Sequence, residues 1–86
     1  MYVHIGQGIM VRSNEIIAFI DKKSVELQRE RDRDYLHHLN VCDLASEKFR
    51  TLVITDTKNY LSPFSTRHLI KQINNASNLD FKVSEV

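Results

Sequence analysis

Residues 49–73 read FRTLVITDTKNYLSPFSTRHLIKQI, and this stretch predicts the centre of the fold. Leu52–Ile54 is a run of branched apolar residues flanked by threonines, which is typical of a strand buried on both faces. Residues 56–59 are polar and favour a turn, so residues 60–62 are expected to run back as the second strand of a hairpin. Pro63 ends that strand because proline has no amide hydrogen to donate to a sheet.

A helix is predicted directly after the hairpin. The fixed φ of Pro63 suits the first turn of this helix, and Ser65 can cap it. Phe64 can pack on Leu69 as a hydrophobic staple. Residues 74–78 are expected to end the helix. The apolar side chains within it recur at helical spacing and predict one buried stripe, formed by Leu69, Ile70 and Ile73.

The N-terminal part predicts further short strands. Residues 2–5 and 9–12 are expected to form a hairpin or a bulged strand that Gly6-Gln7-Gly8 interrupts. A tight turn at Ser13-Asn14 leads into residues 16–20, where β-branched side chains favour a strand over a helix. A further short strand is expected to begin at residues 40–44. Phe81 and Val83 are expected to form an edge strand or a loose tail.

The segment 21–46 is predicted to be a helical connector. Ser24 can cap a helix there, but residues 28–34 are entirely polar and their charges cancel. Each complementary pair adds only about 0.2–0.5 kcal/mol, so a solvated or mobile connector is favoured. The alternative is that this segment docks on a neighbouring subunit or on phosphates. The complementary pairs are Glu26 with Arg29, Glu30 with Arg33 and Arg31 with Asp34.

Length and composition indicate one small domain over residues 1–86. Apolar residues make up 42% and charged residues 27% of the chain, which is typical of a soluble globular protein. No membrane span or secretory signal is found, so a cytoplasmic location is expected. A domain of this size buries only about 60% of its unfolded surface, so a partner subunit would stabilise it. Cys42 is the only cysteine, which excludes an internal disulfide and predicts a small buried side chain.

The residues give no support for catalysis. The four histidines lack the spacing of metal ligands, and no nucleophile elbow, phosphate-binding loop or pair of carboxylates is found. We therefore expect no enzyme activity, no metal, no cofactor and no small-molecule substrate.

Positive charge is concentrated in the second half of the chain. The net charge is only +1, and residues 1–43 carry six basic against seven acidic residues. Residues 48–75, in contrast, carry five basic residues against Asp56 alone, which leaves +4. Arg67 and Lys71 share one helical stripe with Asn74 and Asn78, which is either a secondary basic surface or a plain solvated face.

Two stretches carry a resemblance to a known family. YVHIGQGIMVRSNEIIAFID (residues 2–21) and TLVITDTKNYLSP (residues 51–63), with the capped helix that follows, resemble the small bacterial extracellular-matrix regulatory proteins of the RemA and RemB type, and the RemB branch more closely. The resemblance leaves out residues 22–46, a variable connector in that family. It implies a mainly β domain related to the LytTR DNA-binding fold, and cytoplasmic ring-forming proteins that activate biofilm-matrix genes.

The resemblance also implies a DNA-binding site. Arg12 and Asn14 fall in the first turn of the family, and Lys48 and Arg50 fall in the basic loop and strand that precede VITD. Glu15 and Glu47, however, occupy positions at which the RemA branch is basic.

The overall expectation is an α+β domain with a small, twisted, mostly antiparallel sheet, a helical connector and a C-terminal helix. We expect a cyclic homo-oligomer that binds double-stranded DNA as a transcriptional regulator, provided that Arg50 faces outward rather than pairing with Glu47 or Asp56. The alternative is an oligomeric assembly or protein-interaction regulator without direct DNA binding.

Overall fold

The structure is a computed structural model, and it describes residues 1–46 and 48–77. The elements follow one another as β1 (Tyr2–Gly6), β2 (Ile9–Arg12), the 3₁₀ turn η1 (Ser13–Glu15), β3 (Ile16–Asp21), α1 (Lys22–Arg31), α2 (Tyr35–Leu39), β4 (Val41–Asp43), β5 (Thr51–Thr55), β6 (Asn59–Ser62) and α3 (Thr66–Ser77). The expected features at Asn78, Phe81 and Val83 lie outside the described residues, as does Glu47.

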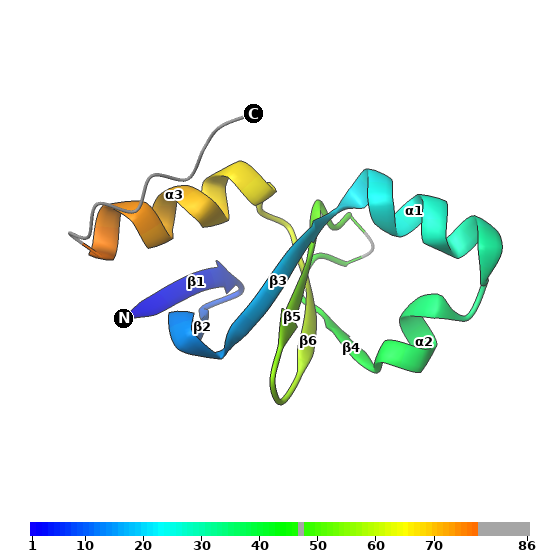
Figure 1. Ribbon diagram of the computed structural model, residues 1–86, viewed down its shortest axis with the longest axis horizontal. Helices are drawn as coiled ribbons and strands as arrows, with labels where there is room; N and C mark the ends of the chain where they lie inside the picture. Colours follow the sequence, from blue (N-terminus) through cyan, green and yellow to red (C-terminus); the bar gives the residue numbers. More distant parts are fainter. Residues whose placement is uncertain (47, 78–86) are drawn as a thin grey trace.

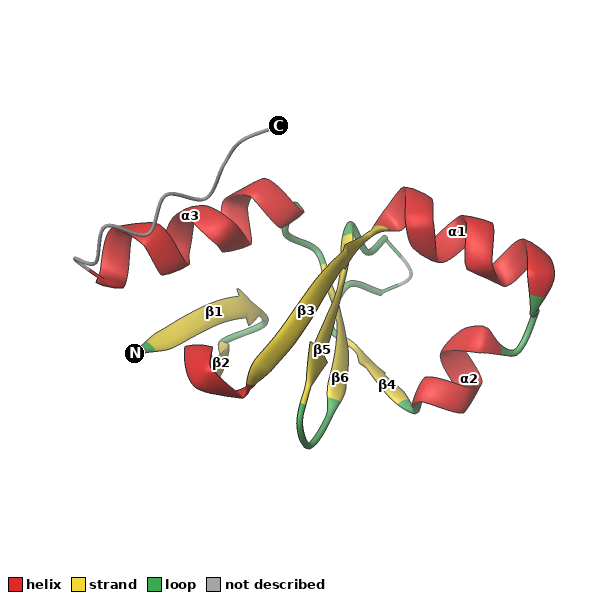
Figure 2. Cartoon of the chain, in the orientation of Figure 1, coloured by secondary structure: helices red, strands yellow, loops and turns green. Residues whose placement is uncertain are grey.

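The elements form three layers, and a four-stranded sheet is the middle layer (Figure 1). The sheet has four strands in the order β3-β5-β6-β4, with β4 parallel to β6 and the other pairs antiparallel. Helices α1 and α2 lie on one side of it, and the β1–β2 hairpin lies with α3 on the other (Figure 2). The predicted α+β fold with mostly antiparallel strands and a C-terminal helix is confirmed, although the strands form two sheets rather than one.

The central strand β5 is buried on both faces, as its sequence predicts. Leu52 and Val53 are both fully buried, and alternation along the strand turns them toward opposite faces. Leu52 joins the cluster beneath α1 and α2, formed by Val25, Phe49, Leu52 and Leu61. Val53 joins the cluster beneath the hairpin and α3, formed by Val3, Ile5, Val11, Leu44, Val53 and Leu69. The strand β5 therefore packs against both outer layers, with α1 and α2 on one face and the β1–β2 hairpin and α3 on the other.

Polar contacts attach the N-terminal hairpin to the C-terminal half of the chain. The side chain of Gln72 on α3 accepts a hydrogen bond from the His4 amide (2.9 Å) and donates one to the His4 carbonyl (2.7 Å). The Ser62 hydroxyl at the end of β6 donates to the Ile5 carbonyl over 2.6 Å. These contacts fix β1 against both β6 and α3, although the bonded residues lie 57 and 68 positions apart in the sequence.

The start of α3 confirms part of its prediction. The Ser65 hydroxyl accepts a hydrogen bond from the His68 amide (3.1 Å), as expected of an N-cap. Phe64 packs against the cluster that contains Leu69. Pro63, in contrast, is not in the first helical turn, because the helix begins three residues later at Thr66.

The connector contains two helices rather than one. Asp21, not Ser24, caps α1, because its carboxylate accepts a hydrogen bond from the Ser24 amide (3.0 Å). The helix ends at Arg31, so the expected partners of Glu30 and Arg31 lie beyond it and do not share its surface. Of the three predicted charge pairs, Glu26 with Arg29 (3.4 Å) is the one that forms within the described residues.

Cys42 is exposed, so the prediction of a buried side chain is wrong. It lies at the centre of the three-residue strand β4, which is at an edge of the sheet. Alternation along β4 turns Cys42 away from the cluster against which its neighbour Val41 packs.

Candidate nucleic-acid interface

The predicted DNA-binding residues lie in two separate places. Arg12 and Asn14 lie where β2 passes through η1 into the start of β3. Arg50 precedes Thr51, which pairs with Asp21 at the opposite end of β3. Six strand residues span about 20 Å, so one subunit does not bring these two groups together.

Arg12 is exposed but held by its neighbours. Its Nε donates to the Tyr2 hydroxyl over 3.4 Å, and its guanidinium carbon lies 5.8 Å from the centre of the Tyr2 ring. The hydrogen bond to Tyr2 and the charge interaction with it, followed by the charge of Glu15, raise the pKa of Arg12 above its ordinary value. Arginine is charged at neutral pH in any case, so the consequence is positional. Tyr2 orients the guanidinium, and the carboxylate of Glu15 offsets part of its attraction for phosphate.

Lys48 and Arg50 have a fixed backbone and exposed side chains. The Arg50 amide donates to the Ser62 carbonyl (2.8 Å), and the Arg50 carbonyl accepts from the Lys22 amide (3.0 Å). The Lys48 amide donates to Ala45 (2.9 Å). Neither side chain forms an ion pair within residues 1–46 and 48–77. Arg50 does not pair with Asp56, which follows the far end of β5.

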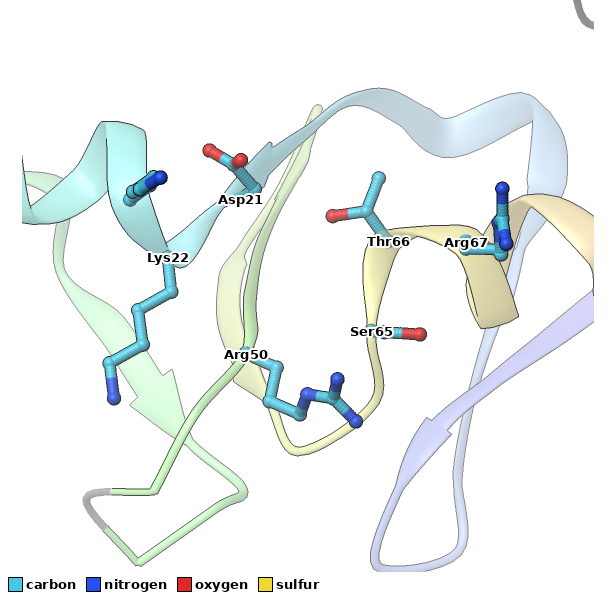
Figure 3. A pocket seen from close by; sticks show the side chains of 7 residues that line it. Asp21, Lys22, Arg50, Ser65, Thr66 and Arg67 are labelled. Atoms are coloured by element: carbon cyan, nitrogen blue, oxygen red, sulfur yellow. The ribbon is translucent and has the colours of Figure 1, made fainter. Parts of the chain in front are cut away.

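The Arg50 side chain borders a shallow pocket of about 370 Å³. Figure 3 shows this pocket between the start of α1 and the start of α3. We call it the basic pocket, because four cationic residues line it against one carboxylate. Its lining residues are Asp21, Lys22, Lys23, Arg50, Ser65, Thr66 and Arg67.

Hydrogen bonds at the start of β5 bring the two helices to this pocket. The bond from the Lys22 amide to the Arg50 carbonyl fastens the start of α1 beside β5. The Thr51 hydroxyl donates to the Phe64 carbonyl (2.8 Å) and lies 3.0 Å from the Thr66 hydroxyl, which fastens the start of α3 to the same strand. Thr51 is fully buried, so these anchors belong to the core.

Asp21 is the one acidic residue that lines the basic pocket, and it is already engaged. The hydroxyl and the amide of Ser24, with a smaller contribution from the charge of Lys23, hold the pKa of Asp21 below its ordinary value. The carboxylate is therefore negative at neutral pH, but the N-terminus of α1 and the positive charge of Lys23 partly offset its negative charge.

Sequence reasoning had identified only part of the basic pocket. Arg50 and Arg67 were both predicted, and the fold brings them together. Lys71, one turn further along α3, is exposed but does not line the pocket. Lys22, Lys23 and Ser65 were not predicted to bind DNA, because the two lysines belong to the acidic half of the chain. The two lysines lie near Arg50 because β3 pairs with β5, and Ser65 lies near it because Thr51 holds the start of α3; no local motif reveals either contact.

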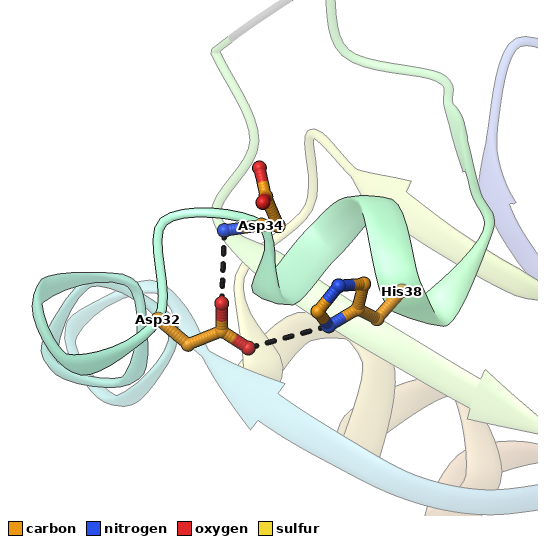
Figure 4. A group of neighbouring side chains, drawn as sticks. All are labelled: Asp32, Asp34 and His38. Carbon is orange, nitrogen blue, oxygen red and sulfur yellow. Dashed lines mark hydrogen bonds and ion pairs between the residues drawn. The ribbon is translucent and has the colours of Figure 1, made fainter.

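A second polar group lies between α1 and α2 (Figure 4). Ligand atoms of Asp32, Asp34 and His38 lie within 4.8 Å of one another, and among residues 1–46 and 48–77 this is the group that could hold a metal ion. One Asp32 oxygen accepts from the Asp34 amide (3.1 Å), and the other lies 3.3 Å from His38 Nδ1. These contacts join the two helices, and they account for the group as a structural link.

No helix in the described part of the chain is long and apolar enough to cross a membrane.

Comparison with protein families gives one match. The RemA-like family, described as extracellular matrix regulatory protein A-like, matches residues 2–73. This range contains every predicted DNA-binding residue and also the connector 22–46. A comparison with curated proteins finds no match. The family is one of regulatory proteins rather than enzymes. With most of its length matched, the chain belongs to the RemA-like family of extracellular matrix regulatory proteins.

Proposed function

We propose that the chain is a DNA-binding transcriptional regulator of extracellular-matrix genes and that it acts as a homo-oligomeric ring. The observation that carries this proposal is the surface around Arg50, where an exposed guanidinium without an ion pair to any described residue borders a pocket lined by three other basic residues. Cationic side chains that are not neutralised by neighbouring carboxylates attract the phosphates of DNA and release their counterions.

A ring strengthens this interaction by repetition. One subunit offers few phosphate contacts, which is too little for useful affinity at physiological salt. Subunits arranged in a ring present the same surface at regular intervals, and a bent duplex can follow them. Once the first subunit is bound, each later contact is intramolecular and gains from a high effective concentration. The loss of binding free energy caused by a substitution at Arg50 is therefore multiplied by the number of subunits engaged.

The test is the substitution Arg50→Ala in the full chain. We expect DNA affinity to fall by more than about tenfold at low salt, because charge-assisted hydrogen bonds are lost at every engaged subunit. Fluorescence anisotropy with a labelled duplex at two or more salt concentrations measures this change. Arg33→Ala is the matched control, because Arg33 is an exposed arginine between α1 and α2 and does not line the basic pocket.

Two results would contradict the proposal. The parent protein would show no binding at low salt, or Arg50→Ala would bind as the control does. Either result favours an assembly or protein-interaction regulator without direct DNA binding. That alternative has its own support in four exposed apolar side chains, Met1, Tyr2, Met10 and Ile17, which a protein partner could cover.

A further inference from the structure

The basic pocket contains donors that the family resemblance does not assign to DNA. Lys23 comes from the start of α1, and Ser65 and Arg67 come from the cap and first turn of α3. They lie beside Arg50 because both helices are fastened to the start of β5. The pocket thus adds contacts from two further elements to the surface around Arg50.

The hydroxyl groups at the pocket differ in what they can offer to an anion. The Thr51 hydroxyl gives its only proton to the Phe64 carbonyl, so in the 3.0 Å contact between Thr51 and Thr66 the donor is Thr66. Thr66 therefore has no proton left for a ligand. Ser65 accepts from the His68 amide and keeps its own proton. Of the two hydroxyls, only that of Ser65 can donate to an anion.

The basic side chains also differ in their availability. The Lys22 ammonium lies 5.7 Å from the centre of the Phe49 ring, and Figure 3 shows its side chain directed away from the pocket. It contributes a long-range positive charge rather than a contact. Lys23, Arg50 and Arg67 remain as cationic donors, and none of them forms an ion pair with a described residue.

The charge and the shape of the pocket indicate which anion suits it. In Figure 3 the carboxylate of Asp21 points toward the start of α1, where it accepts from the Ser24 amide, and not toward Thr66; it remains charged at neutral pH. Four cationic residues outweigh this one carboxylate, so the pocket attracts an anion. The pocket is also shallow and open to solvent, which fits a polymer backbone that passes over it rather than an enclosed small molecule.

From this geometry we infer that the basic pocket binds one backbone phosphate of duplex DNA in each subunit. The donors are the Ser65 hydroxyl, the ammonium of Lys23 and the guanidinium groups of Arg50 and Arg67. This inference rests on the proposed DNA-binding function and extends its surface from the start of β5 to both helices.

Ser65→Asp is the sharpest test. Aspartate caps a helix as well as serine does, so α3 keeps its N-cap while the pocket gains a negative charge. We expect at least about a tenfold loss of DNA affinity at low salt, because the aspartate would repel the DNA phosphate in the basic pocket. Ser65→Asn keeps the cap without the charge and should lose much less. Circular dichroism and size-exclusion chromatography check that both variants fold and assemble as the parent does.

A double substitution tests the cationic donors separately. Lys23→Ala with Arg67→Ala should weaken binding and lower the slope of log affinity against log salt concentration by about 1 per subunit engaged. Arg31→Ala with Arg33→Ala removes the same charge outside the pocket, with Arg31 about 14 Å along the helix from Lys22. This control should retain most of the affinity and of the slope.

The outcomes separate this inference from the proposed function. Arg50→Ala could abolish binding while Ser65→Asp and the Lys23 and Arg67 double variant bind as their controls do. In that case the basic pocket does not bind a DNA phosphate, and the proposed DNA-binding function stands. If the parent protein binds no DNA at low salt, both fail. Inorganic phosphate should not raise the melting temperature above that in sodium chloride of equal ionic strength. A rise that Ser65→Asp removes would assign the pocket to free phosphate instead.

Discussion

Gly6 decides how closely the N-terminal hairpin approaches the end of β6. Its φ is +130°, and an added Cβ would lie 2.7 Å from Cδ of Pro63 and 3.1 Å from its Cγ. Gly6→Ala should therefore lower the free energy of unfolding by about 2–5 kcal/mol, through backbone strain and overpacking together. Urea denaturation at constant protein concentration measures the loss.

Gly8→Ala is the matched control for this substitution. Gly8 also has a positive φ, of +73°, but an added Cβ there would meet no atom within 4 Å. Only the strain term applies, at about 1–2 kcal/mol. Equal losses at both glycines would show that the contact with Pro63 does not limit the packing.

Single residues could be predicted where their effect is local. The cap at Ser65 and the strand end at Pro63 depend on the chemistry of adjacent residues, and the structure confirms both. Ser24 and Cys42 were assigned wrongly for different reasons. α1 begins at Lys22, so Ser24 lies within its first turn and Asp21 takes the cap position; the exposure of Cys42 depends on the edge position of β4 in the sheet.

The pH dependence of α1 should follow the ionisation of its cap. The pKa of Asp21 is lower in the folded chain than in the unfolded one, so its contribution is fully present above the unfolded value of about 3.9. The contribution is then lost as the pH falls through the lower folded value. Asp21→Asn can still cap the helix but does not titrate in this range. Denaturation at pH 3 and pH 7 should show a smaller loss of stability for this variant than for the parent; an equal loss would exclude Asp21 as the cause.

Elements were predictable where neighbours in sequence are neighbours in space. The β5–β6 hairpin and the helix after it were predicted because alternation, turn residues and a cap lie within one stretch. The parallel pairing of β4 with β6 and the separation of the strands into two sheets could not be predicted, since both depend on contacts between distant segments. The break between α1 and α2 was also not predicted, although the polar residues 28–34 indicated a weak helix there.

The candidate site belongs to the scale of the whole molecule. Lys23 and Arg67 lie far apart in sequence and meet at one pocket because Thr51 and the Arg50 carbonyl anchor two helices at the start of β5. Charge counted along the chain placed Lys23 in an acidic half and so hid its contribution. The closer likeness to the RemB branch and the relation to the LytTR fold stay predictions.

Assembly should depend on the exposed edge of the central sheet. β3 is an edge strand among the described residues, and its register shifts between Ile16 and Ala18, which leaves Ile17 67% exposed. A large apolar side chain on an open edge favours a subunit contact. Identical contacts of this kind close into a ring when the rotation between subunits allows it.

Ile17→Glu should therefore dissociate the proposed ring without unfolding the subunit, because a side chain this exposed contributes little to the core of the monomer. DNA affinity should fall with it, since the separated subunits lose the gain from effective concentration. Size-exclusion chromatography with light scattering measures the first effect, and anisotropy with the same duplex measures the second. Leu27→Glu makes the same change at a 59% exposed position on α1 and should preserve the ring. A parent protein that is monomeric at micromolar concentration would contradict the ring, whereas a parent ring that survives Ile17→Glu would place the subunit contact elsewhere.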